Sequence, residues 1–183
     1  MAGSYPLPIN GTLVIPTRRP DLNATVVAGN LAQCKPVIAT NSSTFPGQYP
    51  VAAVDSSNGT AWQPSLPDAS YIVVDLEEQQ SLSGVHINWG EIPAESFEIA
   101  VSNDSETFTT VAQVEVEISA PYDETIAALV EIVVGNTTDA QFSAVGRYAI
   151  FGLQVDGRYI QLIVNGTYGA QTVGATVAEF AVL

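Results

Sequence analysis

The chain has 183 residues, 46% of them hydrophobic, and carries 19 acidic side chains against five basic ones, for a formal net charge of −14. That length suits one domain with a short extra segment, and it is sufficient to bury a core without disulfides. Five Lys and Arg side chains are too few to form the basic surface that phosphate groups require. We therefore expect neither nucleic acid nor an anionic membrane as a partner.

Residues 1–28 are rich in Pro, Asn and Thr, which predicts a leading segment or linker. Over residues 29–183, short apolar stretches alternate with turn residues, a pattern typical of a β-sandwich. The dense apolar run at 72–74 predicts a central strand, and the apolar–polar alternation over 85–89 predicts a strand with one side on the core. Residues 126–134 could begin as a helix, but their β-branched content favours a strand.

No arrangement of residues in the sequence predicts catalysis. The single histidine, His86, lies inside a predicted strand, and the chain contains neither a Gly-x-Ser-x-Gly elbow nor a HExxH motif. Carboxylates such as Glu115 and Glu117 alternate along a strand, so we interpret them as a solvated face. An acid pair of the glycosidase type is the alternative.

Seven of the nine asparagines begin an Asn-x-Ser/Thr sequon, where chance at this Ser and Thr content would give about one or two. The excess predicts an N-glycosylated protein of the secretory pathway that is secreted, vacuolar or in the cell wall. The alternative is a Ser/Thr-rich β protein with accidental sequons. The predicted acceptors are Asn10, Asn23, Asn41, Asn103, Asn136 and Asn165. The seventh, Asn58, lies in a loop motif and is the least suited to carry a sugar.

The N-terminal residues contain no apolar h-region, so the secretion signal that the sequons imply would lie outside this sequence. The lone Cys34 has no second cysteine to pair with. We expect it to be buried. The alternative is a disulfide to another part of a longer parent protein.

The Gly- and Ser-rich stretch 52–62 places Asp55, Ser57 and Thr60 within one turn. Calcium is held by about six to eight oxygen ligands, some of them backbone carbonyls. The stretch therefore suits a structural calcium ion. The alternative is an Asx-turn closed by Asp55 without metal.

Five segments, in this order and spacing, resemble the discoidin domain, also called the coagulation-factor type C domain. They are residues 52–62, 72–76, 96–104, 157–162 and 178–183. The resemblance implies an all-β, galactose-binding-domain-like jelly-roll sandwich of about eight strands. It also implies a binding module that is not an enzyme by itself.

The same resemblance implies that calcium binds between the first loop and the last strand. The implied ligands are Ala52, Asp55, Ser57, Thr60, Ala178 and Glu179. It further implies that Trp62 packs under the loop and that Arg158 and Tyr159 begin a central strand. A buried arginine there would need a carboxylate or carbonyl partner.

In this family the ligand binds to variable loops at one end of the sandwich, which here are 41–50, 62–71, 89–95 and 165–175. Aromatic rings in such loops stack on sugars, and carboxylates accept hydrogen bonds from their hydroxyl groups. The candidate ligand-binding residues are Phe45, Tyr49, Trp89, Glu91 and Tyr168. Trp89 could instead belong to the core. Galactose-binding relatives carry an Arg and an Asn in the third loop, which has neither here, and this argues against galactose.

Residues 10–20, 29–33 and 45–48 are similar to the C-terminal region of fungal acid trehalases, which are hydrolases of glycoside hydrolase family 65. This resemblance implies a non-catalytic carbohydrate-binding accessory module. Its partner would be a carbohydrate or the catalytic domain of the parent protein. The alternatives are a purely structural interdomain-packing module and a small glycosidase in its own right.

Overall fold

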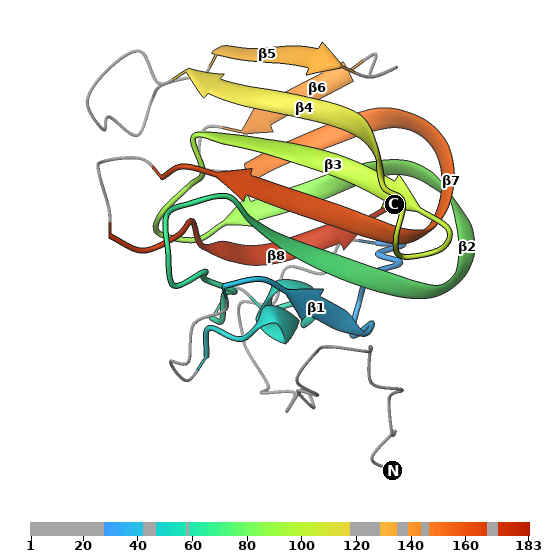
Figure 1. The fold of residues 1–183 in the computed structure, drawn as a ribbon. Helices are drawn as coiled ribbons and strands as arrows, with labels where there is room; N and C mark the ends of the chain where they lie inside the picture. The colour runs from blue at the N-terminus through green and yellow to red at the C-terminus, as the bar shows by residue number, and fades with distance from the viewer. Residues whose placement is uncertain are drawn as a thin grey trace.

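The computed structural model describes residues 28–41, 47–57, 59–117, 129–134, 139–143, 147–167 and 172–183. Apart from one 3₁₀ helix, η1 (Pro50–Val54), its regular elements are strands (Figure 1). They are β1 (Val37–Ala39), β2 (Ser70–Trp89), β3 (Ser96–Ser102), β4 (Thr109–Glu117), β5 (Leu129–Val134), β6 (Asp139–Ser143), β7 (Arg147–Asn165) and β8 (Val177–Val182). The predicted all-β class is confirmed. Residues 1–27 of the predicted leading segment lie outside the described residues. No helix within the described part has the length and hydropathy needed to cross a membrane.

Two long antiparallel strands, β2 and β7, organise the fold. The first part of β2 and the last part of β7 lie in a sheet of order β1–β2–β7–β3–β4–β5. Their other halves pair with β8 and β6 respectively. Between the two halves the register shifts, from Asp75 opposite Tyr159 to Gln80 opposite Gly157. The two halves pack against each other as the layers of a sandwich (Figure 1).

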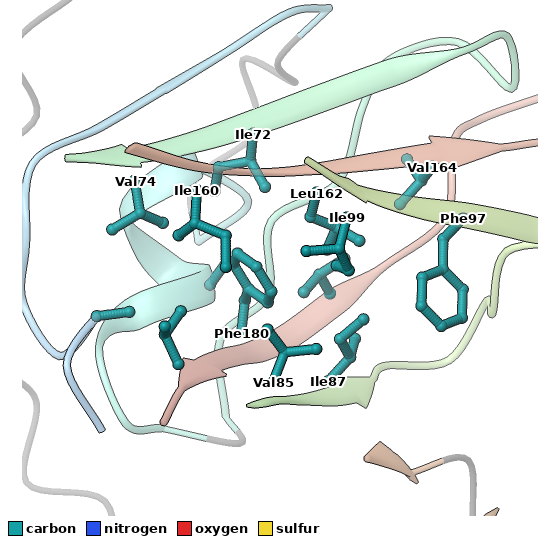
Figure 2. Packing of buried hydrophobic residues seen from close by; sticks show 14 of the residues in the cluster. Ile72, Val74, Val85, Ile87, Phe97, Ile99, Ile160, Leu162, Val164 and Phe180 are labelled. Carbon is teal, nitrogen blue, oxygen red and sulfur yellow. The ribbon is translucent and has the colours of Figure 1, made fainter. Parts of the chain in front are cut away.

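The core lies between these layers and is formed by alternate residues of the paired strands. Side chains from β2, β7 and β3 point toward side chains from β8 and the second half of β2 (Figure 2). The largest fully buried side chains are Trp62, Phe97, Phe180, Ile72, Leu76, Leu82, Ile87, Ile99, Ile160, Leu162 and Val54. Trp62, implied to pack under the first loop, is fully buried and exchanges two backbone hydrogen bonds of 2.8 Å with Val177.

A salt bridge closes the corner where β2 and β7 pass from one layer to the other. The Arg158 Nε and Nη2 atoms donate to the two Asp75 carboxylate oxygens at 2.8 and 2.9 Å. Burial raises the pKa of Asp75, but the hydrogen bonds from Arg158 and the Glu77 amide and the charges of Arg158 and Lys35 outweigh it, so the pKa falls below its ordinary value. Asp75 is thus the partner that Arg158 requires, although the arginine is only half-buried.

Candidate functional site

The first candidate site is built on the turn that follows η1. The Asp55 carboxylate accepts hydrogen bonds from the Ser57 amide at 2.9 Å and from the Thr60 hydroxyl at 2.8 Å. Ser56 adopts a left-handed φ of 61°, which reverses the chain and turns its amide toward β8. The hydrogen bond from Ser57 to Asp55 is the one expected of an Asx-turn.

Strand β8 contributes Glu179, which is only 2% exposed. One Glu179 carboxylate oxygen accepts from the Ser56 amide at 2.9 Å, and the other accepts from the Asn30 side-chain amide at 3.1 Å. The Asn30 side-chain oxygen accepts in turn from the backbone amides of Ala32 and Val182. Asn30 was not among the predicted site residues. It lies 149 positions from Glu179, so no local pattern points to this contact.

Two carboxyl groups therefore face the same turn. Burial raises the pKa of Glu179 to about 8, and the charge of Asp55 adds to that rise, while the hydrogen bonds from Ser56 and Asn30 oppose it. A buried carboxylate beside a second one is costly to ionise without a compensating cation. We call Asp55, Ser57, Thr60 and Glu179 the turn–β8 cluster.

The turn–β8 cluster offers the ligand chemistry of a hard cation. It supplies two carboxylates, two hydroxyl groups and nearby backbone carbonyls, which are calcium ligands. Ala52 lies in η1 and Ala178 in β8, and these two elements contact each other beside the cluster. Within the described residues, no three His, Cys, Asp or Glu side chains gather as a potential metal site. A cation here would therefore depend on carbonyl and hydroxyl oxygens for the rest of its coordination.

The second candidate site is the loop end of the sandwich, where hydrogen bonds join the predicted ligand loops. Gln63, itself 7% exposed, accepts from the Gln48 side-chain amide and donates to the Gly174 carbonyl at 3.2 Å. The amide of Gly174 donates to the Pro64 carbonyl at 2.9 Å. The Thr176 hydroxyl accepts from the Ile92 amide at 2.8 Å. Segments from all four predicted loop regions are thus linked at one end.

The predicted ligand-binding residues have different surroundings. Tyr49 is 38% exposed, and Glu91 is also exposed. Phe45 and Tyr168 lie outside the described residues. Leu66, 47% exposed, was not predicted because its surroundings carry no apolar pattern.

Trp89 corrects one expectation. Its side chain is 5% exposed and packs edge-on against Phe97, with ring centroids 5.6 Å apart. It continues the inward register of Val85 and Ile87 at the end of β2 and belongs to the core cluster. The core alternative therefore holds, and the ring is not available to stack on a ligand.

Three of the predicted glycosylation sites lie in described parts of the chain. Asn41 and Asn103 are exposed in turns, and Asn165 is half-buried at the end of β7. The Asn41 side-chain amide donates to the Ser70 hydroxyl at 3.2 Å, and the Asn103 side-chain oxygen accepts from the Arg158 amide at 3.2 Å. Asn10, Asn23 and Asn136 lie outside the described residues.

Comparison with known proteins finds one matching family model and two similar fungal enzymes. A family model described as the F5/8 type C domain matches residues 38–180. An acid trehalase of Emericella nidulans is 34% identical over 97% of this chain, and a cell wall acid trehalase of Arthroderma benhamiae is 31% identical over 98% of it. The chain spans only 18% and 19% of the length of these two relatives.

The fold also has a counterpart of known structure. Chitosan-binding module 1 of a chitosanase/glucanase from Paenibacillus sp. IK-5 superposes with a TM-score of 0.61 at 25% identity. The match covers 84% of this chain and 96% of the module.

Proposed function

Because the chain belongs to the F5/8 type C, or discoidin, domain family, we propose that it is a carbohydrate-binding accessory module related to regions of acid trehalases. The observation that carries the proposal is the loop end, where the side-chain amides of Gln48 and Gln63 join three of the loops and the Thr176 hydroxyl joins the fourth. Tyr49 and Glu91 are exposed beside these contacts. An exposed ring and a carboxylate on loops held by a rigid scaffold suit sugar recognition. The isolated module is expected not to hydrolyse trehalose.

We further propose an amino-sugar polymer as its ligand. The structural counterpart at 25% identity is a chitosan-binding module, and chitosan carries amino groups that are positively charged at acidic pH. A protein with a net charge of −14 attracts such a polymer. At the loop end, Glu91, Glu95 and Asp68 are exposed carboxylates that can accept hydrogen bonds from its ammonium groups.

A calcium ion at the turn–β8 cluster is part of the proposal. Bound there, calcium would neutralise the charges of Asp55 and Glu179 and tie the turn to the last strand. The Asp55 and Glu179 carboxylates and the Thr60 hydroxyl would hold it, together with the Ala52, Ser57 and Ala178 carbonyls. Its role would be structural. Glycosylation at the exposed Asn41 and Asn103 and a secreted, vacuolar or cell-wall location are proposed on the seven sequons and on the cell wall enzyme among the relatives.

The decisive experiment is titration of the purified chain with glucosamine oligomers, followed by NMR of labelled protein. We expect shifts in loops 47–50, 61–68, 90–95 and 172–176 and weak affinity, because a shallow site buries little surface. Tyr49→Ala should weaken binding several-fold, whereas Tyr49→Phe, which keeps the ring, should bind nearly as well as the wild type. Absence of shifts across glucosamine, glucan and mannan oligomers would instead favour a domain that only packs against a catalytic partner.

A further inference from the structure

The backbone around the sequon asparagine Asn41 is fixed to the loop end of the sandwich. The Asn41 carbonyl accepts hydrogen bonds from the Ser65 amide at 2.6 Å and from the Ser65 hydroxyl at 3.0 Å. The preceding residue, Thr40, is tied to Tyr71 by two hydrogen bonds, both of 2.9 Å. Four hydrogen bonds therefore hold the start of this sequon against residues 65–71.

The Asn41 side chain is held at the same place. Its amide nitrogen donates to the Ser70 hydroxyl at 3.2 Å, and that hydroxyl donates in turn to the Asp68 carbonyl at 3.1 Å. Ser65, Leu66 and Asp68 are exposed around this contact. A sugar linked to the Asn41 amide nitrogen would therefore begin beside loop 61–68, which carries one of the carboxylates proposed to contact the ligand.

Attachment of a sugar is compatible with these contacts. In the transfer, the anomeric carbon of a diphosphate-activated sugar bonds to the Asn41 amide nitrogen as its bond to the diphosphate oxygen breaks. The diphosphate leaves with that electron pair, and the amide loses one proton. The nitrogen carries two hydrogen atoms and keeps one of them, which can still donate to Ser70. Because Asn41 is exposed, the sugar needs no change in the core.

The other sequon asparagines that the structure describes do not combine exposure with this position. Asn165 is half-buried at the end of β7, and Thr167 of its sequon is only 5% exposed. Asn103 is exposed, but it follows the far end of β3, whose first residue pairs with Asn165. Among the described sequons, Asn41 thus places an exposed acceptor at the loop end.

We propose that an N-linked glycan at Asn41 lies over loop 61–68 and restricts the access of a carbohydrate polymer to the loop end. A sugar chain anchored beside Asp68 takes space that a polymer needs in order to reach that carboxylate and Leu66. A group held by a short tether has an effective concentration on the order of millimolar. It therefore hinders a ligand that binds weakly to a shallow site. The inference rests on the carbohydrate binding and the glycosylation proposed above, and adds that the second controls the first.

The test compares the whole chain secreted by a host that N-glycosylates with the same chain from a host that does not. Mass spectrometry of peptides measures the occupancy of Asn41, and isothermal titration with a glucosamine hexamer measures affinity. Ser43→Ala removes the sequon but keeps the Asn41 amide, so it separates loss of the sugar from loss of the hydrogen bond to Ser70. Asn103→Gln, at an exposed sequon away from the loop end, is the matched control.

From the glycosylating host, we expect Asn41 to be occupied and Ser43→Ala to bind the hexamer several-fold more tightly than the wild type. Asn103→Gln should bind like the wild type. From the other host, all three proteins should bind alike, because none of them carries a glycan.

An unoccupied Asn41 would overturn this inference. So would an occupied wild-type protein that binds the hexamer as tightly as Ser43→Ala, or more tightly. In both cases, weakened binding in Tyr49→Ala from the non-glycosylating host would leave the loop-end proposal intact. Absence of binding by every form, including the unglycosylated wild type, would overturn both proposals.

Discussion

At the scale of single residues, the most informative group is the Glu179 carboxyl. The sequence pointed to Glu179 through its position in the last segment, and the structure places it within hydrogen-bond reach of the turn that carries Asp55. The contact with Asn30 could not be predicted, because it depends on how β8 lies against a segment 149 residues away. Trp89 shows the limit of residue type as a guide, since its burial and not its aromatic ring decides its role.

Calcium should stabilise the folded chain through the turn–β8 cluster. A ligand that binds only the folded state raises the melting temperature by mass action, so added calcium should raise it and a chelator should lower it. Asp55→Ala and Glu179→Ala should each abolish the difference, while Asp68→Ala, at an exposed carboxylate, should keep it. Melting curves that do not respond to calcium or chelator, in protein shown to be free of bound metal, would refute the site.

The metal-free protein should lose stability as the pH rises from about 4.5 to about 8. In this window the unfolded chain ionises Glu179, whereas the folded state keeps it protonated because burial raises its pKa to about 8. The stabilising contribution is complete below pH 4.5 and is lost progressively above it, by up to about 5 kcal/mol. Asp75, whose pKa is lowered, stays ionised throughout the window. Urea unfolding at several pH values measures the slope, and Glu179→Gln should flatten it.

Trp89→Ala should cost about 3–5 kcal/mol of unfolding free energy, because it leaves a cavity beside Phe97. Tyr49→Ala, at a 38% exposed side chain, should change stability by less than about 0.5 kcal/mol. Chemical denaturation measures the unfolding free energy of each variant and so tests whether Trp89 belongs to the core. Equal losses in both would contradict the placement of Trp89 in the core.

At the scale of elements, the strands predicted at 72–74 and 85–89 are present, but the sequence could not predict that they form one continuous strand. The segments 72–74 and 85–89 appeared as separate strands because a polar run, residues 77–81, lies between them and looks like a turn. In the structure they are one strand, β2, whose pairing with β7 continues beyond a register shift after Asp75. Such a shift depends on the partner strand, so the periodicity of one segment alone does not predict it.

The loop end depends on a close approach between two loops at Gly174. A Cβ atom added there would lie 2.6 Å from Pro64 Cβ and 2.7 Å from the Leu66 carbonyl oxygen. Gly174→Ala should therefore push the two loops apart at a cost of about 1–3 kcal/mol and weaken glycan binding at the loop end. Calcium-dependent melting should persist, because the turn–β8 cluster is built on other residues. Titration of the Gly174→Ala variant with glycan measures the loss of binding, and calorimetry measures its stability with and without calcium.

At the scale of the whole molecule, the charge of −14 sets how a glycan approaches. Interactions between exposed charges weaken as salt shortens the screening length to about 8–10 Å at 0.1–0.15 M. Binding of glucosamine oligomers should therefore fall several-fold from 20 mM to 500 mM salt. Binding of the N-acetylated oligomers, which lack the ammonium charge, should depend far less on salt. Equal salt dependence for both would contradict charge attraction as a source of affinity.

The hydrogen bonds at Asn30 have a consequence for how the module could be held by a larger polypeptide. The Leu31 amide donates to the Val182 carbonyl at 2.8 Å, and the Val182 amide donates to the Asn30 side chain at 3.0 Å. Asn30 and the end of β8 therefore lie side by side, so a polypeptide that continues after Leu183 would leave the module beside Asn30. That point lies at the end of β8 opposite to Val177, which adjoins the loop end, and Figure 1 shows the C-terminus away from the start of β8. A tether attached after Leu183 would therefore hold one end of the module and leave the opposite end, with the loops, pointing outward. The distance between the loop end and the rest of a longer polypeptide would then depend on the length of the tether, and no bending within the sandwich would be needed.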